Sequence, residues 1–368
     1  MRIAFISPFI YWYKRGIETF TLGLTQELVK INTDINITIL AWHGKNSRQI
    51  PYLSDRLTLS KVPYSRYFQA NIAAIYYWVN FFKSKYDIIN IFFACYGEAK
   101  ALSTLWLLRR QKFNIILQYP YSQVPHRYQE FKRYNLIDKA DNIISVSRFV
   151  ADDLKNFCGR ESKIIYNGFN NYPVISRKEK ESQRFEMGFK PQDKILLSVA
   201  ALEERKGMYK VIKAMPLLKR KFSNLKYIIL GEGSDKANLV SLINKMGLEK
   251  EVFLKGETDK PEQFYDIADV FVLLSRGEAF GLALIEAMGK GLPVVVAKVR
   301  PFDEVVNDRT GFLVDDNNLS AIAATLEKLL SDDILRQTMG EQARCLAVEN
   351  FTWGKIASQY SELFYSQL

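Results

Sequence analysis

The chain is poor in the residues from which metal centres and disulfide frameworks are built. Its 368 residues include three cysteines and two histidines. Cys95, Cys158 and Cys345 lie far apart and form no Cys-x-x-Cys motif, so we expect buried thiols in a protein of a reducing compartment. His43 and His126 are too few to build a histidine-based metal cluster. We therefore expect a mechanism that uses neither a bound metal nor a cofactor.

Long apolar runs are also missing. No uninterrupted run approaches the roughly 18 residues of a membrane-spanning helix. Residues 1–7 are strand-like and too short for a signal peptide. Hydrophobic residues make up 48% of the chain and charged residues 25%, which is typical of a globular protein with a sizeable core. The length predicts two domains, and we expect a cytoplasmic protein.

The positive charge is unevenly distributed. The net charge is +11, and residues 1–171 hold 23 lysines and arginines against 12 acidic residues, whereas residues 172–368 hold 28 of each. A basic half suggests an anionic partner, such as a phosphorylated acceptor or an anionic membrane surface. The sequence has no helix-turn-helix, zinc finger or ribonucleoprotein motif, so we do not expect nucleic acid as a partner.

Residues 64–93 are unusually rich in aromatic side chains, with lysine and arginine between them. Part of this segment, 67–84, is predicted to be a helix. Such a composition favours a packed core, and the second interpretation is an amphipathic surface that lies on a membrane. Together with the basic half, the second interpretation predicts peripheral association with the inner face of the membrane.

Apolar strands alternate with amphipathic helices in both halves, which predicts two doubly wound parallel sheets. The charged segment 172–192 is interpreted as a linker between them. In such sheets, ligands bind at the carboxyl ends of the strands. The predicted strands are 2–7, 35–40, 87–91, 114–120, 141–147, 194–200, 226–233, 270–274 and 293–297, and the predicted helices are 17–29, 208–220, 260–268, 282–288, 318–330 and 351–364.

One stretch, 276–297, combines a turn, a helix and a strand directly after the apolar strand 270–274. Phe280, Gly281 and Leu282 lie where the helix begins. The first amides of a helix have no partner within it, and the helix dipole adds positive charge there, so these amides form an anion site. Because glycine has no side chain, Gly281 allows a ligand to approach the backbone.

Two carboxylates flank this anion site. Glu278 lies in the turn before it, and Glu286 lies five residues into the helix, roughly 8 Å along it. The first carboxylate could bind hydroxyls at one end of a ligand whose middle is a diphosphate, and the second could bind hydroxyls at its other end. A nucleotide sugar is such a ligand. The alternative is that Glu286 belongs to a solvated helix face and that Glu278 is an ordinary loop charge.

The same stretch resembles a known family. Its two glutamates are separated by seven residues, with Phe-Gly after the first and Glu-Ala-Met and then Gly-x-Pro-Val-Val at the second. This pattern resembles that of the retaining glycosyltransferases with the GT-B fold, family 4, also called glycosyltransferase group 1. The resemblance implies two Rossmann-like domains that face a cleft, at 1–171 and 172–350, with a last helix at 351–368 that crosses back to the first domain.

The resemblance also implies a function. A hexose would pass from a nucleoside diphosphate sugar, linked to uridine or guanosine, to an acceptor hydroxyl with retention of the anomeric configuration. The acceptor would be a glycan or a lipid-linked saccharide, in the synthesis of a glycan, glycolipid or polysaccharide.

The resemblance assigns roles to single residues. Glu278 would hold hydroxyls of the donor sugar, and Glu286 would hold the ribose. Lys206, with the amides of Phe280, Gly281 and Leu282, would neutralise the diphosphate, which makes Glu278 and Lys206 the expected catalytic residues.

Further donor contacts are implied elsewhere. Gly16 would face the diphosphate, and Gly231, in a Gly-x-Gly turn, would belong to a second donor loop. Alanines occupy the place of the usual arginine, and Arg205 is the expected replacement. Arg15 replaces a usual glycine, and Gln118 stands where relatives often have a histidine.

Two other functions stay open. A nucleotide-sugar 2-epimerase has the same two-domain fold, but it needs acid and base groups in the cleft, and this chain has few histidines. A non-catalytic binding protein that docks on membranes through its basic half would explain the departures from the family pattern.

Overall fold

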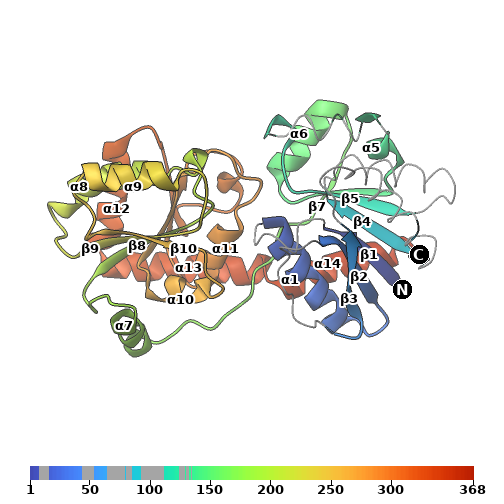
Figure 1. The fold of residues 1–368 in the computed structure, drawn as a ribbon, viewed down its shortest axis with the longest axis horizontal. Coiled ribbons are helices and arrows are strands. Elements are labelled where there is room, and N and C mark those ends of the chain that lie inside the picture. The colour runs from blue at the N-terminus through green and yellow to red at the C-terminus, as the bar shows by residue number, and fades with distance from the viewer. Residues whose placement is uncertain are drawn as a thin grey trace. The chain divides into compact units, whose positions relative to one another are not determined.

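The computed structural model describes residues 1–7, 16–43, 54–63, 79, 85–92, 112–123, 129, 132–133 and 135–368. The chain divides into two compact units, one formed by Met1–Gly168 with Trp353–Leu368 and the other by Phe169–Thr352 (Figure 1). Arg15, His126 and most of the predicted helix 67–84 lie outside the described residues. Within the described ranges, no helix is long and apolar enough to cross a membrane.

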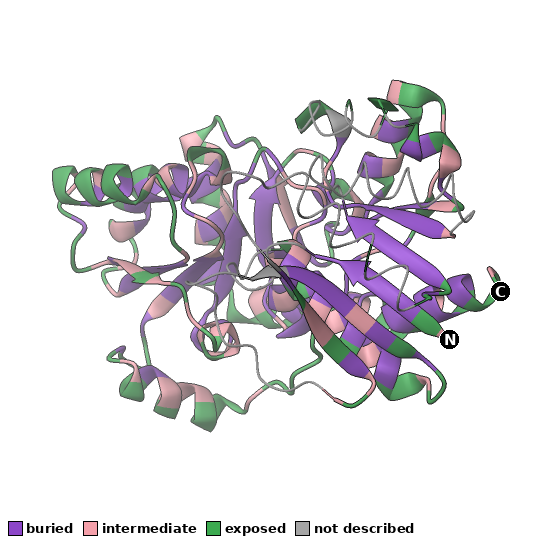
Figure 2. Cartoon of the chain, turned by 45° about the vertical axis from the view of Figure 1, so that its right-hand side comes forward, coloured by how far each residue is buried: buried purple, intermediate pink, exposed green. Residues whose placement is uncertain are grey.

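The first unit contains a seven-stranded parallel sheet in the order β3-β2-β1-β4-β5-β6-β7. The middle strands are apolar on both faces and are buried along most of their length (Figure 2). The strands are β1 (Arg2–Ile6), β2 (Asn36–His43), β3 (Leu57–Pro63), β4 (Ile88–Phe92), β5 (Phe113–Leu117), β6 (Asn142–Ser145) and β7 (Lys163–Ile164), and the helices are α1 (Gly16–Ile31), α5 (Leu136–Lys139), α6 (Arg148–Cys158) and α14 (Trp353–Tyr365), with a 3-10 turn at Tyr121–Gln123.

Helix α14, from the end of the chain, completes the core of the first unit. It packs along α1, whose buried stripe has the four-residue spacing predicted from the sequence. The ring of Phe20 meets those of Trp353 and Tyr360 edge-on, at centroid distances of 5.7 and 6.1 Å. The Trp353 indole lies against Gly23 and Gly168, where an added Cβ would approach it to 2.3 Å.

The second unit contains a six-stranded parallel sheet in the order β10-β9-β8-β11-β12-β13. The chain runs outward from β8 and then returns to add β11 on its other side, so the topological switch point lies between β8 and β11. The strands are β8 (Lys194–Val199), β9 (Leu225–Leu230), β10 (Val252–Gly256), β11 (Val270–Leu273), β12 (Val294–Ala297) and β13 (Gly311–Val314), and the helices are α7 (Arg177–Glu186), α8 (Met208–Lys219), α9 (Lys236–Lys245), α10 (Pro261–Ile267), α11 (Leu282–Gly289), α12 (Leu319–Ser331) and α13 (Asp333–Asn350), with 3-10 turns at Glu204–Lys206 and Phe302–Glu304.

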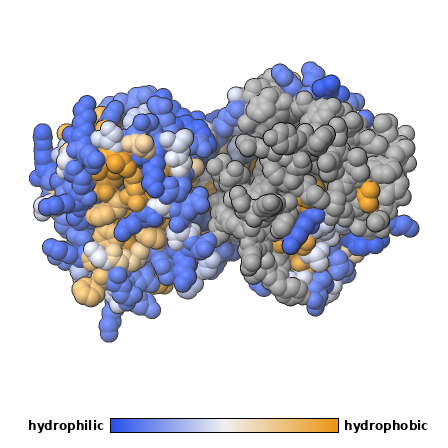
Figure 3. Space-filling model, in the orientation of Figure 1, coloured by the Kyte–Doolittle hydropathy of each residue, from blue (hydrophilic) through white to orange (hydrophobic). Residues whose placement is uncertain are grey.

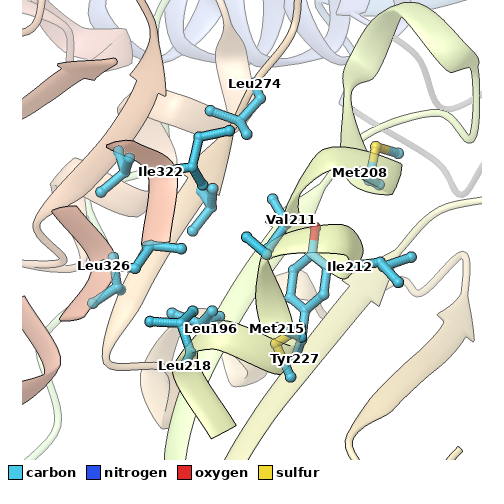
Figure 4. Close-up of a cluster of buried hydrophobic side chains, with 14 of the residues drawn as sticks. Leu196, Met208, Val211, Ile212, Met215, Leu218, Tyr227, Leu274, Ile322 and Leu326 are labelled. Carbon is cyan, nitrogen blue, oxygen red and sulfur yellow. The ribbon is translucent and has the colours of Figure 1, made fainter. Parts of the chain in front are cut away.

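The core of this unit lies where α8 and α12 cover the sheet. Val211 and Met215 of α8 and Ile322 and Leu326 of α12 are buried in one apolar cluster with Leu196 of β8 (Figure 4). On the face drawn in Figure 3, the second unit shows hydrophilic residues around an orange area of hydrophobic ones. The two Rossmann-like units confirm the predicted fold class.

The interpretation of 172–192 as a linker is wrong. Residues 177–186 form α7, which begins with a capping box between Ser176 and Glu179. The guanidinium of Arg184 is buried and donates to the carbonyls of Ile267 and Asp193 and, at 2.9 Å, to a carboxylate oxygen of Asp269. The segment is therefore an integral part of the second unit.

The expectation of buried thiols is also wrong for the two cysteines that the structure describes. Cys158 belongs to α6 and Cys345 to α13, and both residues are exposed. The helices α6 and α13 place these small side chains on their solvent-facing sides.

Candidate functional site

The loops that follow β8 and β11 meet at the carboxyl edge of the second sheet, on both sides of its switch point. Gly207 has a φ of 75°, and a Cβ added there would lie 2.3 Å from the carbonyl oxygen of Leu274. The amide of Arg276 donates to the carbonyl oxygen of Arg205 at 2.9 Å. Only a glycine allows this backbone-to-backbone approach, which brings the two loops into direct contact.

This contact places the two expected catalytic residues side by side. The ammonium of Lys206 donates to Oε1 of Glu278, although the residues are 72 positions apart in the chain. The side chains are 11% and 15% exposed, so the ion pair is largely shielded from water but still reachable. A cation and a carboxylate held together in this way can bind an anionic group and a hydroxylated group of the same ligand.

Arg205 ties the two loops together. Its guanidinium donates to the carbonyl oxygen of Gly277 and, at 2.7 Å, to a carboxylate oxygen of Glu203. The side chain is 45% exposed. The described contacts of Arg205 are therefore with protein groups of the two loops.

The start of α11 offers backbone donors next to this pair. Gly281 has a φ of 101° and precedes the helix, and an added Cβ would lie 3.2 Å from the Phe302 ring. The amides of Leu282 and Ala283 donate to no acceptor in the part of the chain that the structure describes. Phe280 is buried edge-on against Phe351, which anchors the turn. Of the three amides in the predicted anion site, those of Phe280, Gly281 and Leu282, the Leu282 amide is thus open, and the binding of an anion there stays a prediction.

Glu286 lies one helical turn further along α11 and is partly buried. The Tyr265 hydroxyl donates to its Oε2 at 2.9 Å. The pKa of Glu286 is raised to about 7. Burial is the largest cause, the nearby carboxylate of Glu262 adds to the rise, and the hydrogen bond from Tyr265 acts to lower the pKa. Sequence reasoning missed Tyr265, because its spacing in α10 is that of an ordinary core residue.

The Gly-x-Gly turn after β9 is explained by close packing of backbones. Gly231 has a φ of 136°, and an added Cβ would lie 2.0 Å from the carbonyl oxygen of Ala200. A Cβ on Gly233 would lie 2.2 Å from the carbonyl oxygen of Leu202. The β9 loop thus supports the β8 loop, which carries Lys206.

A buried carboxylate, that of Asp316, ties the loop after β11 to helix α8. Asp316 accepts hydrogen bonds from Lys210 and from both Nε and Nη2 of Arg276, at 2.6 and 3.3 Å for the arginine. Burial alone would raise the pKa of Asp316, but these hydrogen bonds hold it below its usual value. No sequence pattern marks this cluster, because its members come from three separate segments.

Across the described residues, no group of three or more histidine, cysteine or acidic side chains could hold a metal ion.

The remaining predicted contacts lie in the first unit. Gly16 is the exposed first residue of α1. Gln118 is buried and exchanges amide hydrogen bonds with Asn167 at 3.3 and 3.5 Å. The structure describes these residues within their own unit, and their roles toward a donor stay predictions.

Two Rossmann-like units of this kind define the GT-B class of proteins. Solved structures of the same fold include sucrose-phosphate synthase from Thermosynechococcus elongatus, with a TM-score of 0.85 and 20% identity over 99% of this chain and 98% of that one. They also include Anabaena HepE in complex with UDP-glucose, with a TM-score of 0.82 and 19% identity over the whole of both chains. At these identities the likeness shows the fold.

The family follows from two further matches. Residues 179–345 match the family described as glycosyl transferases group 1, and residues 14–171 match glycosyltransferase family 4. The chain therefore belongs to the group 1 and family 4 glycosyltransferases, as the resemblance predicted.

Two curated relatives illustrate the range of the family. N-acetyl-alpha-D-glucosaminyl L-malate synthase of Bacillus anthracis is 27% identical over 235 residues, which are 63% of this chain and 61% of the relative. Poly(ribitol-phosphate) alpha-N-acetylglucosaminyltransferase of Staphylococcus aureus is 30% identical over 176 residues, which are 47% of this chain and 36% of the relative. The matches thus span less than two thirds of these relatives.

Proposed function

We propose that this protein transfers a hexose from a nucleoside diphosphate sugar to an acceptor hydroxyl with retention of configuration. The observation that carries the proposal is the Lys206–Glu278 ion pair beside the open amides at the start of α11, with Glu286 one turn further along the same helix. This order of charges matches a sugar, a diphosphate and a ribose in sequence. Family membership supports the same reaction class.

In the proposed reaction, the bond between the anomeric carbon and the diphosphate oxygen breaks while a bond to the acceptor oxygen forms on the same face. The acceptor proton passes to the leaving diphosphate. Negative charge grows on that diphosphate in the transition state, so Lys206 and the α11 amides of Leu282 and Ala283 would stabilise the transition state more than the ground state. Glu278 would orient the sugar through its hydroxyls.

The same groups support a mechanism without a divalent metal. The Lys206 ammonium and the dipole of α11 place positive charge where the diphosphate would lie, which is the task that a metal ion performs in other transferases. We expect turnover to be unchanged when a chelator such as EDTA is added.

The relatives suggest donors and acceptors to try first. One solved neighbour was crystallised with UDP-glucose, and two relatives carry N-acetylglucosaminyl in their names. We therefore propose a UDP-linked hexose as the donor, with a GDP-linked one as the second choice. The acceptor would be a glycan or a lipid-linked saccharide, and the basic first half would favour one carried on an anionic membrane surface.

The decisive test replaces Glu278 with glutamine. We expect Glu278→Gln to lower turnover roughly 100-fold or more, because an orienting charge at the reacting sugar is lost. Release of UDP or GDP from UDP-glucose, UDP-N-acetylglucosamine and GDP-mannose would be measured with a panel of saccharide acceptors. The control is Glu249→Gln, which changes an exposed carboxylate in the same unit.

Three outcomes would contradict the proposal. Equal turnover in Glu278→Gln and wild type would remove the role of Glu278. Epimerised sugar formed without acceptor would indicate the epimerase instead. Tight nucleotide binding without transfer or hydrolysis would indicate a binding protein.

A further inference from the structure

A tyrosine from one helix reaches the functional carboxylate of the next. Tyr265 lies on α10, is 2% exposed, and packs its ring against Phe271 at a centroid distance of 6.1 Å. Its hydroxyl lies 2.9 Å from Oε2 of Glu286 and 3.3 Å from the carbonyl oxygen of Ala283. A hydroxyl has one proton to donate, and the charge of an ionised carboxylate makes the Glu286 oxygen the stronger acceptor.

We propose that Tyr265 is a positioning residue for the donor, which holds Glu286 through Oε2 and leaves Oε1 for the ribose hydroxyls. This inference rests on the proposed function. A carboxylate can accept from both hydroxyls of a ribose diol, but the terminal torsion of a glutamate side chain is broad, so a hydrogen bond to one oxygen restricts how the carboxylate is turned. A buried phenol whose ring is already packed fixes that oxygen without moving itself.

The charges around Glu286 make the contact more than a mechanical support. Burial and the Glu262 carboxylate both raise the pKa of Glu286, whose value is about 7, and the hydrogen bond from Tyr265 acts against them. Asp266 of α10 and Lys290, the residue that follows α11, form their own ion pair at 2.7 Å. The Tyr265 hydroxyl donates to the ionised form of Glu286, so it favours the form that accepts hydrogen bonds from ribose.

The pH dependence of nucleotide binding follows with a definite sign. The ionised form of Glu286 binds the ribose, so affinity should rise as the pH increases through about 7. Removal of the Tyr265 hydroxyl takes away an interaction that lowers the Glu286 pKa. The rise in affinity should therefore shift to higher pH in Tyr265→Phe.

The experiment is isothermal titration of the full chain with UDP, and separately with GDP, between about pH 5.5 and 8.5. We expect Tyr265→Phe to bind about five- to tenfold more weakly at pH 7, the size of one hydrogen bond, and to show the shifted pH profile. Glu286→Gln should bind more weakly and lose this part of the pH dependence. Its remaining pH dependence reports the terminal phosphate of the nucleotide, which titrates near pH 6.

Tyr360→Phe is the matched control. Tyr360 is a buried tyrosine in the first unit whose hydroxyl has no hydrogen-bond partner among the described residues. Loss of that hydroxyl should leave nucleotide affinity and its pH profile as in the wild type. Circular dichroism of all variants would verify that the fold is kept.

The outcomes separate this inference from the proposed function. If Glu286→Gln weakens binding but Tyr265→Phe keeps wild-type affinity and pH profile, the role of Tyr265 is refuted while the site stands. If the wild type binds neither nucleotide, or if Glu286→Gln binds both as tightly as the wild type, the proposed site itself is refuted.

Discussion

At the level of single residues, the carboxylate of Glu286 lowers the stability of the folded protein in the ionised form that we propose binds the ligand. Its pKa is about 7 in the folded protein against an ordinary value of 4.5, because the folded chain buries it. Between these values the folded chain holds more protons than the unfolded chain, so the free energy of unfolding falls as the pH rises from about 4.5 to 7. Above pH 7, the ligand-free protein carries the full cost of a partly buried charge.

Glu286→Gln should therefore be more stable than the wild type at pH 8 without ligand. We expect a gain of about 1–3 kcal/mol that shrinks toward zero as the pH falls to about 4.5. Urea unfolding followed by circular dichroism at several pH values would measure it, with Glu249→Gln as the exposed control. A Glu286→Gln variant that is less stable than the wild type at pH 8 would show that the carboxylate is well solvated.

The residues named from sequence and those missed differ in how their neighbours are encoded. Lys206 and Glu278 lie in local patterns, a turn before a helix in each case, and the parallel sheet then brings the turns together. Tyr265 and Asp316 act through contacts with segments 21 to 106 positions away, which no local pattern reveals. Their roles depend on which side chains meet after folding.

At the level of elements, α7 shows what composition conceals. Its polar, charged composition predicted a linker. The side chain of Arg184 is nevertheless buried in the unit and donates hydrogen bonds to carbonyl oxygens at the ends of neighbouring elements. The Ser-x-x-Glu pattern at 176–179 was the available signal of a helix start. Helix α13 was missed for a different reason, because Met339 is the one large apolar residue among its buried positions, and the small residues Gly340, Ala343 and Ala347 give a weak apolar pattern.

Arg184→Ala should destabilise the second unit strongly. The change leaves the buried carboxylate of Asp269 and three carbonyls with fewer donors, so we expect a loss of about 3–5 kcal/mol. Arg177→Ala in the same helix removes an exposed pair with Glu181 and should cost at most about 0.5 kcal/mol. Thermal unfolding of the two variants compares them directly. Equal melting temperatures would mean that α7 contributes little to the unit.

At the level of the whole molecule, the chain builds its first unit from both of its ends. The alternation of apolar strands and amphipathic helices was enough to predict two parallel α/β sheets, because each strand buried on both faces must be covered by helices. That α14 belongs to the first unit followed from the resemblance alone, since an amphipathic helix carries no mark of the surface that it covers.

Trp353 is the residue through which this return of the chain can be tested. Its indole fills a space bounded by Gly23 and Gly168, neither of which has a side chain to occupy the hole left by Trp353→Ala. We expect a loss of about 3–5 kcal/mol, because a large cavity stays open in the core. Hydrogen exchange should become faster in β1 and α1 of the first unit and stay unchanged in β8 and β11 of the second. Ser358→Ala, on the exposed side of the same helix, should leave exchange as in the wild type. Faster exchange in β8 and β11 to the same degree would show that the two units open together, and unchanged exchange in β1 would show that α14 does not stabilise the first sheet.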